Sequence, residues 1–312
     1  MRAVGFSEFG GPEVLRIIDV PEVHAGAGEV RIRNLAATVN PTDLIARNGG
    51  RAEAMGEDPP PYVPGMEVAG IVDEVGEGVE TGVAVGDRVL GIVVTKAAHG
   101  GYREQIALDA RSVVPVPDGV SFAEACTLPM NGLTARQVLD RLALTPGETL
   151  AVTGAAGAFG GYVIQLAKAD GLTVIADAAD ADRVLVDSFG PEIIVPRGDE
   201  FAAEVRKHVP DGVDGLADGA VLREKAVPAV KDGGAFSSVR GWAGNGARDI
   251  RFETTSVRAY AFEHEKLDRL RQQVEDGVLT LRLAATYSPE DAAEAHRRLE
   301  AGGTRGRLVI EF

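Results

Sequence analysis

The stretch TLAVTGAAGAFGGYVIQLAKADG, residues 149–171, decides the fold of this chain. Its apolar run TLAVT predicts a buried strand, and Gly154, Gly157 and Gly160 predict a tight turn directly after it. Apolar residues then recur at helical spacing, at Phe159, Val163, Ile164 and Ala167. This order of strand, glycine turn and helix is typical of a dinucleotide site, because glycines let the backbone approach a pyrophosphate and the helix N-terminus offers free N–H groups.

The glycine spacing, GxxGxxG, departs from the more usual GxGxxG, and the alternative interpretation is a turn that only permits close packing. A following helix and second apolar strand favour the dinucleotide site. The residues predicted to bind the cofactor in and near this turn, and in the later Gly-rich segment GWAGNGA, are Gly154, Ala156, Gly157, Ala158, Phe159, Gly160 and Gly241.

The second strand, LTVIAD, ends at Asp177, where a dinucleotide site reads the adenosine ribose. A carboxylate there accepts hydrogen bonds from both ribose hydroxyls and repels a 2′-phosphate, so Asp177 favours NADH. Arg183 could instead pair with such a phosphate, although Asp180 and Asp182 lie beside it. The alternative for these acids is a solvated loop.

The rest of the chain predicts an α/β protein of two domains. Further apolar strands at 192–196 and 234–239 alternate with helical stretches, which indicates a doubly wound parallel sheet over residues 119–255. Residues 1–118 contain short strands separated by Gly, Pro and Asp, which is typical of a compact β-rich domain. Residues 256–312 end in a helix near 289–301 and a strand RLVIEF, and we expect them to return to the first domain.

Composition narrows the choice of partners. The chain has 312 residues and a net charge of -15, which argues against nucleic acid and an anionic membrane. No apolar run is long enough to span a bilayer and the first residues lack a signal-peptide pattern, so a cytoplasmic location is expected. Cys126 is the single cysteine, which excludes an intrachain disulfide, and its apolar surroundings predict a buried thiol.

Motifs outside the glycine turn follow one family in order along nearly the whole chain. They are FGGPEVL near the start, NPTD at 40–43, PGMEVAG at 64–70, VGEGV at 75–79, GDRV at 86–89, GGYREQ at 100–105, LPMNGLTA at 128–135 and RGRLVI near the end. The chain resembles the quinone-oxidoreductase branch of the medium-chain dehydrogenase/reductase family. The resemblance implies a GroES-like domain, a Rossmann domain with the cofactor in the cleft, and hydride transfer from NADPH or NADH to a quinone or an α,β-unsaturated carbonyl.

The resemblance also implies roles for individual residues. Asn40 would contact the nicotinamide ribose side of the site, Thr134 the carboxamide, and Asp43 would hold the NPTD loop. Tyr62 is the nearest phenolic donor to an acceptor. Asn40, Asp43 and Tyr62 are therefore the candidate catalytic residues, with turn formation or aromatic packing as the alternative for each.

Neither zinc site of the family can be built from these residues. Zinc-dependent relatives have a cysteine in place of Asn40 and a histidine in place of Met66, and Cys126 alone cannot form a four-cysteine site. No metal is therefore expected. NADPH-dependent members often carry a serine, a lysine and a tyrosine where this chain has Ala179, Arg183 and Pro196, which leaves the choice between NADH and NADPH open.

Two other functions remain open from the sequence. One is an enoyl-thioester reductase, for which the stretch Arg47–Arg51 is a weak basic candidate. The other is a dinucleotide-binding protein without turnover, suggested by Arg51 and Ala52 where relatives often carry a pocket tyrosine. The resemblance further implies a homodimer, formed through an exposed edge strand GAFSSV at 234–239.

Overall fold

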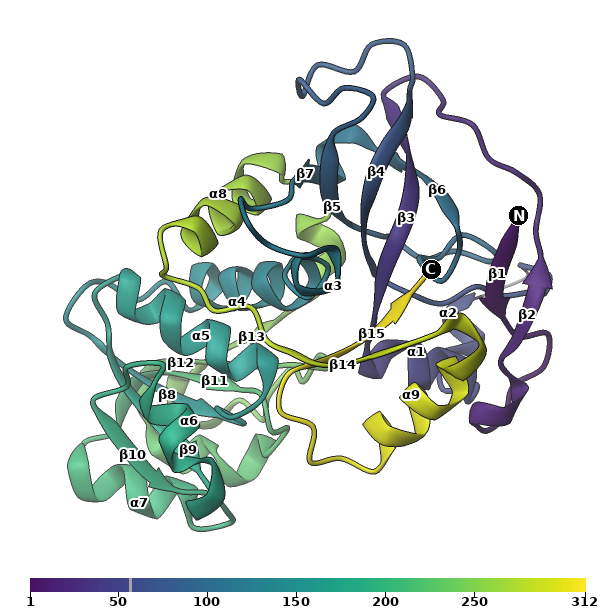
Figure 1. Ribbon diagram of the computed structural model, residues 1–312. Helices are drawn as coiled ribbons and strands as arrows, with labels where there is room; N and C mark the ends of the chain where they lie inside the picture. Colours follow the sequence, from purple (N-terminus) through teal and green to yellow (C-terminus); the bar gives the residue numbers. More distant parts are fainter. Residues whose placement is uncertain (56–57) are drawn as a thin grey trace. The chain divides into compact units, whose positions relative to one another are not determined.

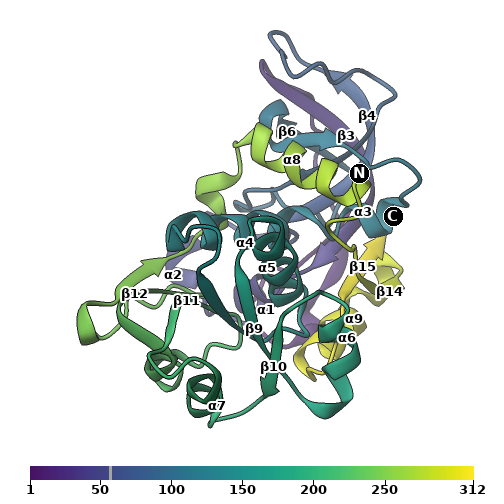
Figure 2. The same ribbon diagram turned by 90° about the vertical axis from the view of Figure 1, so that its left-hand side faces the viewer.

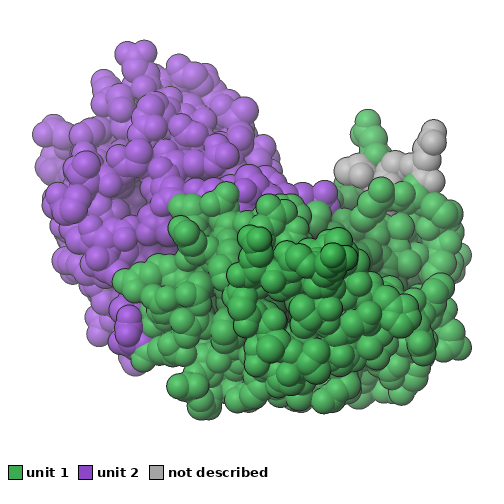
Figure 3. Space-filling view, turned by 90° about the horizontal axis from the view of Figure 1, so that it is seen from above, with its two compact units in different colours: residues 1–130, 261–275, 281–312 green, residues 131–260, 276–280 purple. Residues whose placement is uncertain are grey.

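The computed structural model describes residues 1–55 and 58–312 (Figure 1). The chain divides into two compact units, coloured separately in Figure 3. Unit 1 comprises residues 1–130, 261–275 and 281–312, and unit 2 comprises residues 131–260 and 276–280. The first boundary therefore lies twelve residues beyond the expected 118/119, because a short helix, α3 (Phe122–Ala125), packs on the sheet of unit 1.

Unit 1 is built on a seven-stranded sheet. Its strand order is β14-β15-β3-β4-β5-β7, with β6 also paired to β3, and a separate pair β1-β2 lies outside it. The strands are β1 (Arg2–Gly5), β2 (Arg16–Asp19), β3 (Glu29–Val39), β4 (Glu67–Val75), β5 (Arg88–Ile92), β6 (Gln105–Asp109), β7 (Val113–Pro115), β14 (Leu283–Tyr287) and β15 (Arg307–Glu311). The predicted β-rich character of the first domain is confirmed.

Most of the C-terminal segment belongs to unit 1, namely residues 261–275 and 281–312, whereas residues 256–260 and 276–280, which were also expected there, belong to unit 2. Strand β15 pairs antiparallel with β3, with Leu308 opposite Val39, and is buried along most of its length. The helices of this unit are α1 (Pro41–Arg47), α2 (Ala52–Met55), α3, α8 (His264–Glu275) and α9 (Ala292–Glu300). Helix α9 contacts both β3 and β15, so the last residues of the chain complete the core begun by the first.

Unit 2 is a six-stranded parallel sheet with helices, which confirms the predicted Rossmann domain (Figure 2). Its strand order is β10-β9-β8-β11-β12-β13. The strands are β8 (Thr149–Thr153), β9 (Thr173–Ala178), β10 (Ile193–Pro196), β11 (Val213–Asp218), β12 (Val230–Ser238) and β13 (Arg251–Thr254), and the helices are α4 (Pro129–Leu142), α5 (Ala158–Ala169), α6 (Arg183–Asp187) and α7 (Phe201–His208). The strand order reverses between β8 and β11, and ligands of such sheets bind at the carboxyl ends of the strands where this reversal occurs.

The prediction that the segment 234–239 forms an edge strand is wrong. The segment 234–239 falls on β12, which pairs with β11 on one side and with β13 on the other. The edges of this sheet are β10 and β13. Strand β13 has the sequence RFET. It was not predicted, because it is only four residues long and two of these residues are charged, so it is not an apolar run. No helix of the described residues is long and apolar enough to cross a bilayer.

Candidate functional site

The glycine turn lies at the carboxyl end of β8, and its three glycines are needed for different reasons. Gly154 has a φ of +68°, a conformation that favours glycine. Gly160 packs against the turn itself, since a Cβ there would lie 2.4 Å from the carbonyl oxygen of Gly154. Gly157 has an ordinary φ of -72° and precedes helix α5 as its N-cap. A Cβ at Gly157 would lie 3.1 Å from the carbonyl oxygen of Gly154, directly before the first turn of α5, whose backbone N–H groups lack partners within the helix.

Asp177 has a different environment from the one expected of a ribose-binding carboxylate. Its side chain is 2% exposed and accepts a hydrogen bond from the backbone N–H of Ala155 at 2.9 Å. Burial raises the pKa of Asp177, while hydrogen bonds from the N–H groups of Ala155 and Gly154 lower it. Asp177 therefore braces the glycine turn through a buried carboxylate. Strand β9 continues for one more residue, Ala178.

The carboxyl end of β9 is flanked by exposed basic side chains. Arg183 begins helix α6, and the backbone N–H of Arg197 donates to the carbonyl oxygen of Ala178 at 3.0 Å. The Arg197 side chain is close enough to Asp177 to lower the pKa of that carboxyl. Pro196 was the residue expected at this place from the sequence, and its neighbour Arg197 was not predicted, because apolar residues alone do not fix the register of β10.

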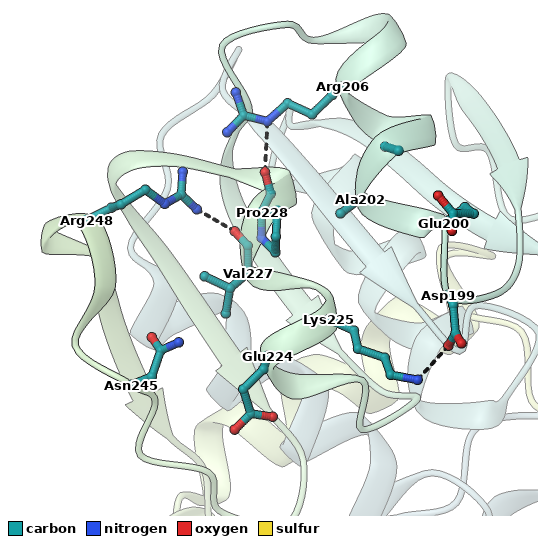
Figure 4. Close-up of a pocket in the computed structure, with 11 residues that line it drawn as sticks. Asp199, Glu200, Ala202, Arg206, Glu224, Lys225, Val227, Pro228, Asn245 and Arg248 are labelled. Carbon is teal, nitrogen blue, oxygen red and sulfur yellow. Dashed lines mark hydrogen bonds and ion pairs between the residues drawn. The ribbon is translucent and has the colours of Figure 1, made fainter.

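A hollow in unit 2 has a volume of about 720 Å³ (Figure 4). It lies beside α7, where two short 3-10 turns (Arg223–Lys225 and Val227–Ala229) replace a crossover helix between β11 and β12. Two arginines line it, but their guanidinium groups donate to backbone carbonyls: Arg206 to Pro228 at 2.8 Å and Arg248 to Val227 at 2.6 Å. These arginines support the main chain where a helix is missing, and they do not form a free anion site.

In unit 1 the NPTD loop joins a buried ion pair. Arg307 of β15 donates from one nitrogen to Glu67 Oε1 and to Asn40 Oδ1, both at 2.6 Å. The amide of Asn40 donates to the same Glu67 oxygen at 3.0 Å, and the backbone N–H of Met130 donates to Glu67 Oε2 at 3.1 Å. Glu67 and Asn40 are 0% exposed and Arg307 is 6% exposed. Burial raises the pKa of Glu67, and the charge of Arg307 lowers it.

Asp43 connects the same loop to the C-terminal helix. Its carboxylate accepts hydrogen bonds from the backbone N–H of Asn40 at 2.8 Å, from that of Gly65 at 3.0 Å, and from the hydroxyl of Tyr102 at 3.2 Å. The Tyr102 hydroxyl also lies 3.2 Å from Nε2 of the fully buried His296 of α9. Burial lowers the pKa of His296 to about 3, so its imidazole is neutral and Nε2–H can donate to Tyr102 while Tyr102 donates to Asp43.

Asp43 gives unit 1 a specific dependence on pH. Burial raises the pKa of Asp43 from 3.8 to about 6, against the hydrogen bonds that lower it. The folded chain therefore binds more protons than the unfolded chain between these pH values, and the free energy of unfolding falls as pH rises through this range. We expect the ionisation of Asp43 to lower the free energy of unfolding by up to about 3 kcal/mol over this range, and we expect the Asp43→Asn protein not to show this decrease. Denaturation curves from pH 4 to 7 measure the difference; parallel curves for both proteins would contradict the expectation.

Tyr62, Thr134 and Gly241 make none of the hydrogen bonds of this network among those described above. The hydroxyl of Tyr62 donates to the backbone carbonyl of Asp58 at 2.9 Å, and its ring stacks on Phe9 with centroids 5.8 Å apart. Thr134 lies on α4, and Gly241 lies in the loop after β12 with a φ of +66°. Cys126 is buried, as its context predicted, and burial raises the pKa of its thiol.

Three members of the buried clusters were not predicted from the sequence: Tyr102, His296 and Arg307. A single guanidinium at the start of the apolar strand RLVIE was the signal available for Arg307, because a buried charge needs a partner. His296 offered no signal beyond its place on the apolar face of a helix.

Comparison with known proteins places this geometry in a family. Two family models match: the alcohol dehydrogenase GroES-like domain over residues 26–118, and zinc-binding dehydrogenase over residues 190–310. An NADPH-dependent alkenal/one oxidoreductase of Arabidopsis thaliana, named chloroplastic, is 30% identical, and the match covers 99% of this chain and 79% of that protein. The chain belongs to the medium-chain dehydrogenase/reductase family. The resemblance inferred from the motifs is thereby confirmed, and the chain is an oxidoreductase.

Two further members of the medium-chain dehydrogenase/reductase family show the range of the similarity. A quinone oxidoreductase of Lama guanicoe is 28% identical, and the match covers 99% of this chain and 97% of that protein. A crystal structure of an NAD-dependent alcohol dehydrogenase superposes with a TM-score of 0.87 at 29% identity and covers 100% of both chains. Because each match covers nearly the whole chain, both units of this medium-chain reductase resemble the corresponding parts of those proteins.

The zinc named by one family model does not fit the residues present. The amide of Asn40 and the thioether of Met66 are poor zinc ligands, and the carboxylate of Glu67 is already paired with Arg307. Among the described residues, no three His, Cys, Asp or Glu side chains are grouped so that they could hold a metal ion. By contrast, the glycine turn and the N-terminus of α5 fit the pyrophosphate of a dinucleotide.

Proposed function

We propose that this protein transfers hydride from NADPH to a quinone or an α,β-unsaturated carbonyl without using zinc. The observation that carries the proposal is the glycine turn at the reversal point of the parallel sheet, in a chain of this family. Support for the substrate class comes from the relatives named quinone oxidoreductase and alkenal/one oxidoreductase.

The chain's own groups bind and orient the two reactants. The N–H groups at the start of α5 would hold the pyrophosphate, Thr134 would contact the carboxamide, and Gly241 would leave room beside the dinucleotide. When bound, the dinucleotide would supply the hydride. Without a Lewis acid, the negative charge that develops on the acceptor oxygen must be met by hydrogen bonds and delocalisation, which suits conjugated acceptors. Tyr62 can serve as a donor only by leaving the carbonyl of Asp58.

Preference for NADPH is supported by the end of β9. The carboxylate of Asp177, which would repel a 2′-phosphate, is buried against the glycine turn. The exposed side chains of Arg183 and Arg197 flank the strand end, and a guanidinium pairs readily with phosphate. NADPH is therefore the proposed cofactor, in place of the NADH that Asp177 favoured.

A steady-state assay tests this function directly. We expect oxidation of NADPH in the presence of a simple quinone or an enone, with a specificity constant for NADPH at least about tenfold above that for NADH. Arg197→Ala should remove most of this preference, while Arg258→Ala, on a short turn elsewhere in unit 2, serves as the matched control. Elemental analysis should find far less than one zinc per chain.

Other outcomes of the same assay assign the alternatives. Reduction of an enoyl thioester with no activity on quinones or enones would favour the thioester reductase. Dinucleotide binding without oxidation across all three acceptors would favour a protein without turnover. About one tightly held zinc per chain, or equal use of both dinucleotides, would contradict the corresponding part of the proposal.

We further propose a homodimer in the cytoplasm. The dimer would form through β13, since this strand and β10 are the edges of the parallel sheet and an unpaired edge promotes association. Light scattering at micromolar concentration measures the assembly, and a monomer would contradict it.

A further inference from the structure

Strand β11 carries a carboxylate at each end, and each is held by a threonine of β8. Asp214, near the amino end, accepts hydrogen bonds from the hydroxyl of Thr149 at 2.6 Å and from its backbone N–H at 2.7 Å. Asp218, at the carboxyl end, accepts a hydrogen bond from the hydroxyl of Thr153 at 2.6 Å. The two ends differ in function, because ligands of such a sheet bind at the carboxyl ends of the strands, beside the point between β8 and β11 where the strand order reverses.

Asp218 is fully buried and accepts four hydrogen bonds, two on each oxygen. Oδ1 accepts from Thr153 and from the backbone N–H of Leu222 at 3.0 Å. Oδ2 accepts from the backbone N–H of Arg223 at 2.9 Å and from the hydroxyl of Ser238 at 3.0 Å. Asp218 therefore ties strands β8 and β12 to the loop of residues 219–223, which we call the β11 loop.

The β11 loop is held in an unfavourable conformation. Val221 has a φ of +59° and Arg223 a φ of +52°, values that side chains disfavour, and a β-branched residue disfavours them most. The two loop N–H groups bound by Asp218 belong to Leu222 and Arg223, directly after Val221. Such strain persists only where the surroundings fix the backbone, and here the fixing group is the buried carboxylate.

The β11 loop lies against the glycine turn. The backbone N–H of Ala220 donates to the hydroxyl of Thr153 at 3.1 Å, and a Cβ on Gly154 would lie 3.0 Å from the Ala220 nitrogen. Gly219 of the loop lies close to helix α5, since a Cβ on Gly219 would lie 2.9 Å from the ring of Phe159. Nε of Arg223 is buried and has no hydrogen-bond partner among the described residues.

We propose that Asp218 is a positioning residue for dinucleotide binding, which clamps the strained β11 loop beside the glycine turn so that the loop forms one wall of the site. The inference rests on the proposed function. Because the loop is strained, its binding conformation would not persist without the clamp, and part of the binding free energy would then be spent on restoring it.

The substitution Asp218→Asn tests the clamp with little change in shape. Whichever way the amide is oriented, its NH₂ group faces one backbone N–H of the β11 loop, because each carboxylate oxygen accepts from one such group. We expect the Kd for NADPH, measured by calorimetric titration, to rise about tenfold or more, while kcat at saturating NADPH changes less than threefold. Asp214→Asn is the matched control, and its Kd should stay within about twofold of wild type.

A second variant separates positioning from a general loss of stability. Val221→Gly removes the strain, since glycine adopts a φ of +59° readily, and in the Asp218→Asn background it should recover most of the lost affinity. A melting curve of each protein accompanies the titrations. Should Asp218→Asn fail to fold, Ser238→Ala removes one of the four bonds and should raise the Kd about threefold.

The outcomes distinguish this inference from the proposed function. A wild-type protein that binds neither NADPH nor NADH overturns the proposed function. If wild type binds but Asp218→Asn keeps native affinity, or if Asp214→Asn weakens binding equally, the proposed function stands and the role of Asp218 is refuted.

Discussion

Replacing Arg307 by methionine should lower the free energy of unfolding by about 3 to 5 kcal/mol at pH 7, because it leaves a buried carboxylate without its counterion. Glu67 is 0% exposed, and Arg307 donates to it at 2.6 Å. Methionine keeps much of the length of the arginine side chain, so the expected loss of stability comes from the missing charge and hydrogen bonds. Chemical denaturation of both proteins measures the difference.

The pH dependence identifies the cause of this loss. Burial already raises the pKa of Glu67, and removing Arg307 takes away the largest effect that lowers it. The carboxyl of the variant should therefore protonate more readily on folding, and the deficit should shrink as pH falls. Arg307→Met combined with Glu67→Gln should recover much of the stability, since no buried charge remains. Arg305→Met, at an exposed arginine two residues earlier, should change little; an equal loss there would contradict the argument.

Gly157→Val should weaken dinucleotide binding by about a hundredfold or more while the fold persists. A branched side chain at the start of α5 would occupy the space that phosphate oxygens need, and two lost charge-assisted hydrogen bonds of about 1.5 to 3 kcal/mol each account for the effect. The φ of Gly157 is -72°, so valine meets no left-handed strain there. Calorimetric titration with NADPH and NADH, beside a melting curve, measures both properties.

Gly160→Ala is a comparison for the stability part of this prediction, because its added methyl group meets the backbone of the turn directly. A Cβ at Gly160 would lie 2.4 Å from the carbonyl oxygen of Gly154 and 2.7 Å from Cα of Ala155, so the turn itself must shift. At Gly157 the corresponding contact, again with the oxygen of Gly154, is 3.1 Å. We expect Gly160→Ala to lower the melting temperature more than Gly157→Val does. Native affinity in a well-folded Gly157→Val protein would contradict the dinucleotide site.

Periodicity along the sequence was enough to predict the parallel sheet and the return of the C-terminal strand. The strands β8 and β9 are continuous apolar runs because both faces of a parallel sheet are buried. Strand β13 was missed because RFET is polar and lies at an edge. Because β13 was not predicted, the neighbouring strand β12 was taken as the edge strand that would form the dimer contact.

The site was less predictable, because its decisive contacts join residues far apart in sequence. Position alone suggested that Asp177 reads a ribose, yet its carboxylate turns back to the N–H of Ala155, 22 residues earlier. Asn40 and Glu67 acquire their environment from Arg307, which lies more than 200 residues away. Which way a side chain points at the end of a strand depends on tertiary packing that no local pattern contains.

Strand β15 also constrains the order in which the chain can fold during synthesis. Residues 131–260 form nearly all of unit 2 without interruption, so that unit can fold as soon as they leave the ribosome. The sheet of unit 1 is completed later, because β3 pairs with β15 only after about 270 further residues have been made. Until then Glu67 has no guanidinium and must stay hydrated. A ribosome stalled before residue 307 would therefore carry a folded dinucleotide unit attached to an unfinished sheet, and this nascent chain would be open to chaperones and proteases at β3.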